Sequence, residues 1–320
     1  MKIFENKNNW LVTGGAGFIG SHLIEDLIDN NQRIYCVDDF SSGLRENLKK
    51  NKYLKVIKSR IQNLDKKLLD YKFKGIFHLA SQVSAPKSIK SMYSSSSNNL
   101  LSSLKVWDIA KKMKTPIVYA SSSAVYGNLS VGDDQIETSS ILSPYSMDKL
   151  SIENYANLFW RLYGIPSVGL RFFNVYGPRQ DASSPYSGVI SIFLDRLLSN
   201  EIITVNGGYQ TRDFIYVKDV SQVLIKSMNY CFQEKDCDVF NVGTGKSISI
   251  NHLIRIISNL LKIEPKIIRK ELPKGDPEIS NCKTEKIKNK MQIEVHNFSA
   301  LEKGLTLLLK HLKNTKKYPN

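Results

Sequence analysis

Cysteine is scarce in this chain, which has four thiols in 320 residues, no CxxC spacing and no nearby pairing with histidine. Disulfide frameworks and metal sites both need such clusters. We therefore expect free thiols in a reducing compartment, a cytoplasmic location and no metal site. The four thiols belong to Cys36, Cys231, Cys237 and Cys282.

Long apolar runs are also missing. No stretch approaches the roughly 20 apolar residues that span a bilayer. The segment before the first strand pattern is short and polar and comprises only residues 1–9. We therefore expect no room for a secretory signal. We expect neither a membrane-spanning nor a secretory segment.

Acidic residues are few, with 30 Asp and Glu against 45 Lys and Arg, and the formal net charge is +15. One interpretation is a protein that binds nucleic acid or an anionic surface. The other is a lysine-rich solvated surface around a pocket for an anionic ligand. The lysines are spread along the chain, thicken only near 283–290 and 310–317, and do not alternate with aromatics as in a single-strand binding platform. We favour the second interpretation and expect no nucleic-acid or membrane partner.

Short apolar runs alternate with helical patterns through the first half of the chain. This rhythm predicts a parallel sheet covered by helices on both faces. After Asn174 it is interrupted by a loop rich in Ser, Pro and Gly. The expected strands are 10–12, 34–37, 54–57, 76–79, 117–119, 168–170, 202–205, 239–242 and 266–268. The expected later helices are 189–198, 219–230, 250–261 and 301–309.

The segment Thr13 to Gly20, TGGAGFIG, follows the first expected strand and opens the first helix. Glycine permits a tight turn and lets the backbone approach a pyrophosphate. The helix start then offers N–H groups and a favourable dipole to the anion. Glycines also mark ordinary turns, but the strand before this loop and the helix after it are those of a dinucleotide-binding motif.

Asp38 closes the second expected strand, about 20 residues after the glycine loop. There a carboxylate can accept hydrogen bonds from both ribose hydroxyls and would repel a 2′-phosphate. The alternative is a surface turn acid beside Asp39. We predict NAD as the cofactor, in preference to NADP.

Tyr145 and Lys149 form a YxxxK pair, and Pro144 precedes them at the start of a helical pattern. At this spacing both side chains share one helix face. An ammonium and a positive nicotinamide ring would both favour the phenolate and lower the pKa of Tyr145. The phenolate could then take a proton from a sugar hydroxyl while hydride leaves the same carbon. Alone, the pair could be an ordinary exposed helix pair.

The serine triplet Ser121–Ser122–Ser123 ends a strand that we expect in the parallel sheet. Ligands bind such sheets at the carboxyl ends of their strands, so a serine there could share the reacting proton. The triplet alone is also compatible with a polar loop. The ordered set of glycine loop, Asp38, serines and YxxxK is much harder to explain by accident.

Taken together, these motifs resemble the extended short-chain dehydrogenase/reductase family, in particular its nucleotide-sugar epimerase/dehydratase branch. The similarity runs from about residue 10 to about residue 287, and it is greatest to UDP-hexose and UDP-N-acetylhexosamine 4-epimerases. It also includes the segments HLASQ (78–82), LRFFNVYGPR (170–179), QTRDFIYVKD (210–219) and NVGTG (241–245).

The resemblance implies an α/β fold: a doubly wound parallel sheet (Rossmann fold) with a smaller, discontinuous C-terminal substrate domain. The NAD-binding domain would comprise 1–173 plus about 211–243. The nucleotide-sugar-binding domain would comprise about 174–210 plus 244–320.

The resemblance also implies roles for individual residues. Ser122, Tyr145 and Lys149 would be catalytic, and Asn174 and Arg212 would bind the diphosphate of the substrate. His78 is better explained as a packed residue than as a ligand. The implied cofactor contacts are Gly14, Gly17, Phe18, Ile19, Gly20, Asp38, Asp39, Leu79, Ala80, Ser81, Asn99, Tyr145 and Lys149. The implied substrate contacts are Ser84, Ser122, Ser123, Asn174, Arg212, Asp276 and Ser280.

Three positions depart from the family. Arg60 stands where many members carry an acid that meets the adenine. Pro273 replaces an arginine for the phosphates, for which Lys274 is a possible substitute. Lys283 replaces a frequent aspartate.

A homodimer is expected, because the helices near 100–109 and 152–162 carry apolar residues on more than one face, and the resemblance implies a four-helix interface there.

Three functions are compatible with the motifs. The leading one is NAD-dependent 4-epimerisation of a UDP-hexose or UDP-N-acetylhexosamine through a 4-keto intermediate. A 4,6-dehydratase or a sugar-acid decarboxylase would carry acids just after the catalytic serine, where this chain has Ser123 and Ala124. A non-catalytic dinucleotide-binding scaffold, or an RNA-associated relative, is suggested by the charge, but the intact serine, tyrosine and lysine argue against it.

Overall fold

A computed structural model describes residues 4–64, 66–136, 139–181, 188–273 and 276–315. The chain divides into two compact units. The first unit comprises Met1–Val125, Ile141–Phe172 and Ser221–Phe240, and the second unit comprises Tyr126–Ser140, Phe173–Val220 and Asn241–Asn320. The domain boundaries predicted from the sequence instead place 126–140 and 211–220 in the NAD-binding domain, and these boundaries stay a prediction.

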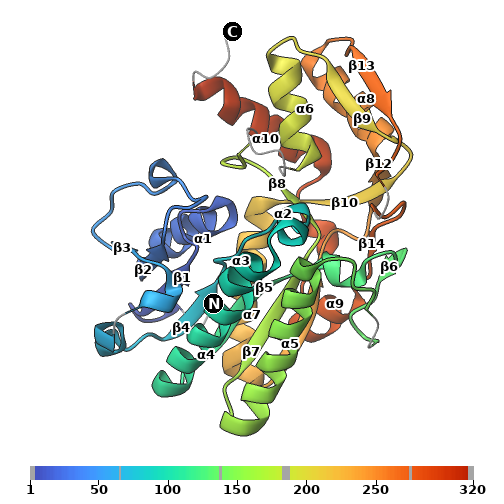
Figure 1. The fold of residues 1–320 in the computed structure, drawn as a ribbon. Coiled ribbons are helices and arrows are strands. Elements are labelled where there is room, and N and C mark those ends of the chain that lie inside the picture. The colour runs from blue at the N-terminus through green and yellow to red at the C-terminus, as the bar shows by residue number, and fades with distance from the viewer. Residues whose placement is uncertain (1–3, 65, 137–138, 182–187, 274–275, 316–320) are drawn as a thin grey trace. The chain divides into compact units, whose positions relative to one another are not determined.

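A parallel seven-stranded sheet organises the first unit. Its strands are β1 (Asn9–Thr13), β2 (Arg33–Asp38), β3 (Leu54–Lys58), β4 (Gly75–His78), β5 (Ile117–Ser122), β7 (Ser167–Phe172) and β11 (Cys237–Val242). They lie in the order β3-β2-β1-β4-β5-β7-β11 (Figure 1). The chain runs outward from β1 on one side and from β4 on the other, so the order reverses between these two strands. This confirms the predicted doubly wound α/β fold, whose ligands bind at such a reversal.

Helices cover both faces of this sheet. They are α1 (Phe18–Asp29), α2 (Ala85–Lys90), α3 (Met92–Ser96), α4 (Ser102–Met113), α5 (Pro144–Tyr163) and α7 (Val217–Glu234). Leu11 and Ile76 belong to a core cluster that also contains apolar residues of α4 and α5. The neighbouring Trp10 points to the opposite face, where its ring centroid lies 6.5 Å from that of Phe232 on α7. Alternate side chains of a strand face opposite ways, so each strand is buried twice.

Two helix-initiation signals, a capping box and a proline in the first turn, mark the start of helix α5. Ser143 and Ser146 exchange hydrogen bonds as a capping box, and Pro144 occupies the first turn. The helix ends at Gly164, whose φ of 63° is left-handed and costs glycine little. These signals place Tyr145 in the first turn.

The second unit contains three small sheets, in the orders β12-β10-β8, β13-β9 and β14-β6. The strands are β6 (Val131–Gly132), β8 (Asn174–Tyr176), β9 (Ile203–Asn206), β10 (Thr211–Tyr216), β12 (Ser247–Ser249), β13 (Ile267–Lys270) and β14 (Asn281–Cys282). The helices are α6 (Val189–Leu198), α8 (Ile250–Leu261), α9 (Glu285–Met291) and α10 (Leu301–Asn314). The helices predicted over 189–198 and 250–261 are confirmed. Among the described residues, no helix is both long and apolar enough to cross a membrane.

Candidate active site

The glycine loop joins the end of β1 to the start of α1. Gly14 has a left-handed φ of 69°, and a Cβ there would lie 2.6 Å from the backbone nitrogen of Ala80. A Cβ at Gly20 would collide with the carbonyl oxygen of Gly14. Gly17 caps α1 without a side-chain acceptor, so no side chain competes for the first N–H groups of the helix. The loop therefore keeps an anion-accepting helix start clear, as a dinucleotide pyrophosphate requires.

Asp38 ends β2 beside this loop. Its Oδ2 accepts a hydrogen bond from Ala16 N–H and its Oδ1 accepts one from Phe40 N–H, both at 2.9 Å. Phe40 itself has a left-handed φ of 59°, a conformation that a bulky residue rarely adopts. Burial raises the pKa of Asp38, and these two bonds oppose the increase. A carboxylate has about four acceptor sites, so two backbone bonds leave capacity for ribose hydroxyls, and the residues present fit NAD.

Ser122, Tyr145 and Lys149 lie together in the first unit. Tyr145 is 8% exposed and Lys149 is 3% exposed. The hydroxyl of Ser122 acts on the Tyr145 phenol and lowers its pKa, and its Oγ accepts the Ala124 N–H at 3.1 Å. Lys149 Nζ lies 5.8 Å from the Tyr145 ring centroid and donates to the Ala120 carbonyl oxygen at 2.8 Å. One strand end and one helix face thus bring together the three groups that the sequence analysis singled out.

Burial controls the charges of this cluster. It lowers the pKa of Lys149 to about 8, while the nearby Asp148 and Glu153 carboxylates favour the ammonium. Burial raises the pKa of Tyr145, and the Ser122 hydroxyl only partly offsets this. In the protein alone, burial therefore outweighs any effect of the ammonium on the tyrosine pKa. The lowering expected in the complex with NAD, from the ammonium and the positive nicotinamide ring together, stays a prediction.

Asn99 lies within a π-helical turn, Ser97–Leu101, before α4. Its Oδ1 accepts hydrogen bonds from Ser81 Oγ at 2.9 Å and from Gln82 N–H at 2.8 Å. Its Nδ2 donates to Asp148 Oδ2 at 3.3 Å. Such π turns are frequent at functional sites. Asn99 therefore joins the loop after β4 to the residue that precedes Lys149.

His78 is a packed residue, as the sequence analysis favoured. Its Nδ1 lies 2.7 Å from Thr13 Oγ1 and its Nε2 lies 2.9 Å from Ser103 Oγ. Burial lowers the pKa of His78 to about 3, which leaves the ring neutral. Ser103 already donates its proton to the Asn99 carbonyl oxygen, so His78 Nε2 must carry the proton in their shared bond. Among the described residues, no group of three potential metal ligands occurs.

Three predicted substrate residues of the second unit are held by other protein groups. Arg212 Nη2 donates to Asp276 Oδ1 at 2.5 Å, and its Nη1 donates to the Pro277 carbonyl oxygen at 2.8 Å. Asn174 Nδ2 donates to the Asp213 carbonyl oxygen at 3.0 Å. Arg212 and Asp276, both predicted to bind substrate, are thus brought into contact with each other.

The three other serines predicted to contact the substrate, besides Ser122, differ in their hydrogen bonding. Ser84 is buried, and its Oγ accepts the Lys87 N–H at 3.1 Å as the cap of α2. Ser123 and Ser280 are half-buried, and no hydrogen bond engages their side chains in the described part of the chain. Ser84 therefore has a structural role that the sequence analysis did not anticipate.

The sequence pattern of the NAD dependent epimerase/dehydratase family matches residues 10–243. The chain belongs to this family. Its members use NAD, in agreement with the glycine loop and Asp38.

Relatives within the family differ in activity. A protein of Methanocaldococcus jannaschii, provisionally named a UDP-glucose 4-epimerase, is 37% identical over 253 residues, 78% of this chain and 81% of its own. A UDP-N-acetyl-alpha-D-glucosaminuronate decarboxylase of Bacillus cytotoxicus is 31% identical over 318 residues, 93% of this chain and 96% of its own. A UDP-N-acetylglucosamine 4-epimerase from Methanobrevibacter ruminantium M1, in complex with UDP-N-acetylmuramic acid, has 35% identity and a TM-score of 0.89. That structural match covers 97% of this chain and 99% of the other.

The structure accounts for two of the three departures from the family. Lys283 Nζ lies 2.8 Å from Asp133 Oδ2, so it fastens the end of β14 to the loop after β6. Arg60 Nε lies 3.7 Å from Asp39 Oδ2 in a partly exposed pair, so the cation meets the acid that follows Asp38. Lys274, which could substitute for the missing arginine beside Pro273, lies outside the described residues.

Sequence reasoning assigned no role to two buried acids. Asp213 accepts hydrogen bonds from the Thr244 N–H at 2.9 Å and the Gly245 N–H at 2.8 Å, and so anchors the loop after β11. Glu153 forms a buried ion pair with Arg171. The signal for Glu153 was available, because it continues the four-residue spacing of Tyr145 and Lys149.

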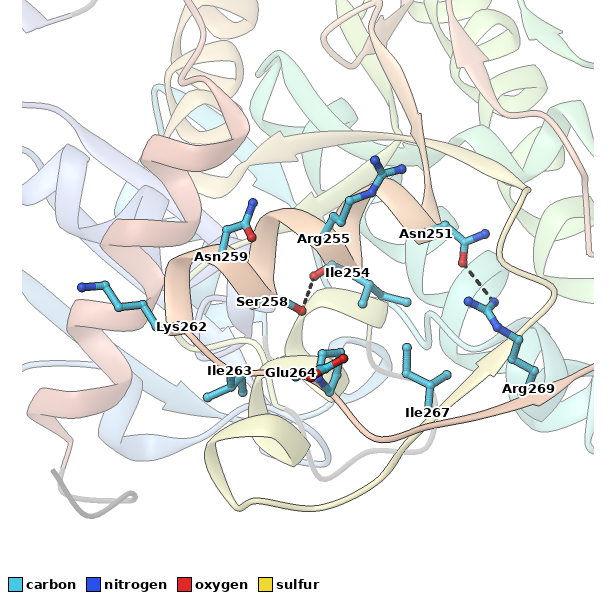
Figure 2. A pocket seen from close by; sticks show the side chains of 11 residues that line it. Asn251, Ile254, Arg255, Ser258, Asn259, Lys262, Ile263, Glu264, Ile267 and Arg269 are labelled. Atoms are coloured by element: carbon cyan, nitrogen blue, oxygen red, sulfur yellow. Dashed lines mark hydrogen bonds between the residues drawn. The ribbon is translucent and has the colours of Figure 1, made fainter.

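A hollow of about 670 Å³ beside α8 and β13 is a poor anion site (Figure 2). Arg255 and Lys262 point away from one another, and Arg269 is held by Asn251 Oδ1 at 3.0 Å. The cations therefore do not converge on one group. None of the predicted substrate residues lines this hollow.

Proposed function

We propose that this protein is an NAD-dependent 4-epimerase of a UDP-hexose or UDP-N-acetylhexosamine. The observation that carries the proposal is the buried Ser122–Tyr145–Lys149 cluster, followed in the chain by Ser123 and Ala124. The cluster is equipped to move a proton at a sugar hydroxyl. The two following residues offer no carboxylate for a second acid or base.

Each residue of the cluster has a step in the proposed reaction. NAD, when bound, supplies the acceptor of the sugar C4 hydride. Tyr145, as the phenolate, takes the proton of the 4-hydroxyl, and the nearby Ser122 hydroxyl shares that proton. Lys149 stabilises the phenolate as an ammonium. The 4-keto sugar then turns in its pocket, and Tyr145 returns the proton as hydride returns to the opposite face.

Arg212 and Asn174 are proposed to hold the diphosphate of the substrate. A guanidinium suits phosphate because its planar donors match the phosphate oxygens. The contact with Asp276 would orient Arg212 before the substrate arrives. Support comes from the UDP-linked ligand in the M. ruminantium structure and from that protein's name.

The alternative within the family is a decarboxylase or a 4,6-dehydratase. Similarity to the B. cytotoxicus decarboxylase over nearly the whole chain favours it. Its chemistry needs further acid–base groups beside the serine, and Ala124 cannot transfer a proton. We therefore rank this alternative second.

Heavy water separates the two functions. The NAD-loaded protein is incubated in heavy water with UDP-, dTDP- and GDP-sugars, and the products are identified by NMR. An epimerase returns a C4 epimer with its C5 hydrogen intact. Deuterium at C5 with a 4-keto-6-deoxy product would show a dehydratase, and release of carbon dioxide from a UDP-uronic acid would show a decarboxylase.

We also propose that the protein is a cytoplasmic homodimer. Leu101, Tyr155, Leu158 and Leu162, near the start of α4 and on α5, have exposed side chains, and Leu162 is 60% exposed. Such a patch suits a second copy of the chain. Light scattering at micromolar concentration should give a dimer mass for the parent and a monomer mass for Leu158→Glu/Leu162→Glu. The variant Leu307→Glu, at an exposed leucine of α10, should stay dimeric, and a monomeric parent would contradict the proposal.

A further inference from the structure

A buried carboxylate that the proposed reaction does not use lies beside the catalytic cluster. Glu153 is one helical turn beyond Lys149 and two beyond Tyr145 on α5, so the three side chains lie along one helix face. The Glu153 side chain is only 6% exposed. A buried charge of this kind needs partners.

Glu153 has partners on two strands. Its Oε1 accepts hydrogen bonds from Ser121 Oγ at 2.5 Å and from Arg171 Nε at 2.9 Å. Its Oε2 accepts one from Arg171 Nη2 at 2.7 Å. The Arg171 side chain is 11% exposed, so this two-bond pair is almost fully removed from water.

These bonds join the elements that carry the cluster. Ser121 and Arg171 are paired across β5 and β7, and Ser122 is paired with Phe172 one residue further on. Glu153 reaches this position from α5, the helix that carries Tyr145 and Lys149. The strand end with Ser122 is therefore tied to the helix with the tyrosine and the lysine.

The charges around Lys149 are few and unequal. Asp148 and Glu153 act on it from α5, and both favour its ammonium form. Arg171 on β7 balances the charge of Glu153. His78 on β4 is neutral. Tyr145, whose ring centroid lies 5.8 Å from Lys149 Nζ, is protonated in the protein alone. Asp148 accepts a hydrogen bond from Ser96 Oγ at 2.7 Å. Of these two acids, Glu153 is the one that is bonded to the end of β5, through Ser121.

We propose that Glu153 is a positioning residue: it fixes the end of β5 that carries Ser122 and supports the ammonium of Lys149 by its charge. This inference rests on the proposed function only in giving Ser122 and Lys149 their chemical roles. Arg171 sets how much of the Glu153 charge reaches Lys149.

Titration of Lys149 tests the electrostatic part. The ¹³Cε shift of Lys149 is followed against pH in the full-length, ¹³C-lysine-labelled protein, with and without NAD, and is assigned by its loss in Lys149→Met. We expect Glu153→Gln to lower the midpoint by about one pH unit. Arg171→Gln should raise it, because the carboxylate loses its counter-charge. The double variant Glu153→Gln/Arg171→Gln should lie between the two.

Loosened packing alone would give a different pattern. Water entry would move the Lys149 midpoint upward, toward the value of a solvated lysine, in both single variants. An upward or absent shift in Glu153→Gln would therefore overturn the electrostatic part. If Glu153→Gln does not fold, the Lys149 midpoints of Arg171→Gln and of the charge-neutral double variant are compared instead. The double variant should then have the lower midpoint. Asp238→Asn, which removes another buried acid of the first unit, should leave the midpoint unchanged.

Ser121→Ala tests the positioning part, because it removes the link to β5 and keeps the charge of Glu153. Turnover should fall about tenfold with the Lys149 midpoint unchanged. Unchanged turnover would overturn this part. The titration needs no sugar, so the expected midpoint shifts together with inactivity on every nucleotide sugar would reject the proposed function and leave the electrostatic part standing.

Discussion

The proposed catalytic cluster of the first unit and the predicted diphosphate residues of the second unit are built in different ways. Tyr145 and Lys149 are one helical turn apart, and Ser122 is supplied by a neighbouring strand end. Arg212 is instead oriented by Asp276, 64 residues further along the chain. The first arrangement follows from helix periodicity and strand order. The second arrangement depends on a contact between residues that are far apart in the chain. We therefore expect it to be the part that differs among relatives with different substrates.

The two regions also differ in how strongly their surroundings act on charge. Lys149 is buried, and its pKa is about 8. Arg212 is 13% exposed, while its partner Asp276 is 42% exposed and meets water. Solvent screens a half-exposed pair and leaves a buried ammonium sensitive to every nearby group. We therefore expect substitutions in the first unit to have the larger effects.

The largest effect is expected from Tyr145→Phe. The change keeps the ring and removes the proton acceptor, so turnover should fall about 1,000-fold or more while NAD stays bound. Activity is measured by NMR of the sugar product and NAD binding by calorimetry. Tyr155→Phe, on the same helix with a partly exposed side chain, should keep near-parent activity. Substantial epimerisation by Tyr145→Phe would mean that another base does the work.

A smaller loss is expected from Asp38→Ala. The predicted ribose contact would disappear, and each charge-assisted hydrogen bond is worth about 1.5–3 kcal/mol, so NAD should bind at least tenfold more weakly. The parent should prefer NAD clearly over NADP. Calorimetric titration with both dinucleotides checks this, and equal or tighter binding of NADP to the parent would reject the assignment of Asp38.

The first unit could be predicted largely from the sequence because its signals are local. Pro144 and the YxxxK spacing predicted helix α5, and the glycines marked the turn after β1. The raised pKa of Tyr145 in the protein alone was not predicted, because a motif shows the ammonium but not the depth of burial. The role of Glu153 also needed the fold, since its partners come from β5 and β7.

The second unit was less predictable because its strands are held by distant partners. Residues 211–216 form strand β10, which the sequence analysis treated only as a motif. The strand places Asp213 where Thr244 and Gly245 donate to it, about 30 residues later, and no local pattern shows this. The pairing of Lys283 with Asp133 spans 150 residues and was equally hidden.

The charge of Lys149 destabilises the fold, although the proposed reaction uses that charge. Its pKa is about 8 in the fold, against 10.5 for a lysine in an unfolded, solvated chain, so the unfolded state holds the proton more tightly. The ammonium therefore destabilises the fold below pH 8, and this cost declines as pH rises toward 10.5. Allowing for the lost bond to Ala120, Lys149→Met should raise the free energy of unfolding by about 2 kcal/mol at pH 7. Denaturant unfolding at pH 7 and pH 10 checks this, and a gain that does not shrink at pH 10 would contradict it.

The smallest effect is expected in the second unit, at Ser280. The family resemblance implies that this residue lines the pocket beside the C2 substituent of the sugar, where a bulky side chain excludes an acetamido group. Ser280 is half-buried and small, so we predict that UDP-N-acetylglucosamine is a substrate. Ser280→Tyr should lower kcat/KM for that sugar about tenfold relative to UDP-glucose, because one misfitted group in a pocket is worth about 1–3 kcal/mol. Ile279→Tyr adds the same ring at the preceding, exposed position and should leave the ratio unchanged. If the parent acts on UDP-glucose alone and Ser280→Tyr changes nothing, Ser280 does not select the sugar, and specificity is set by other residues.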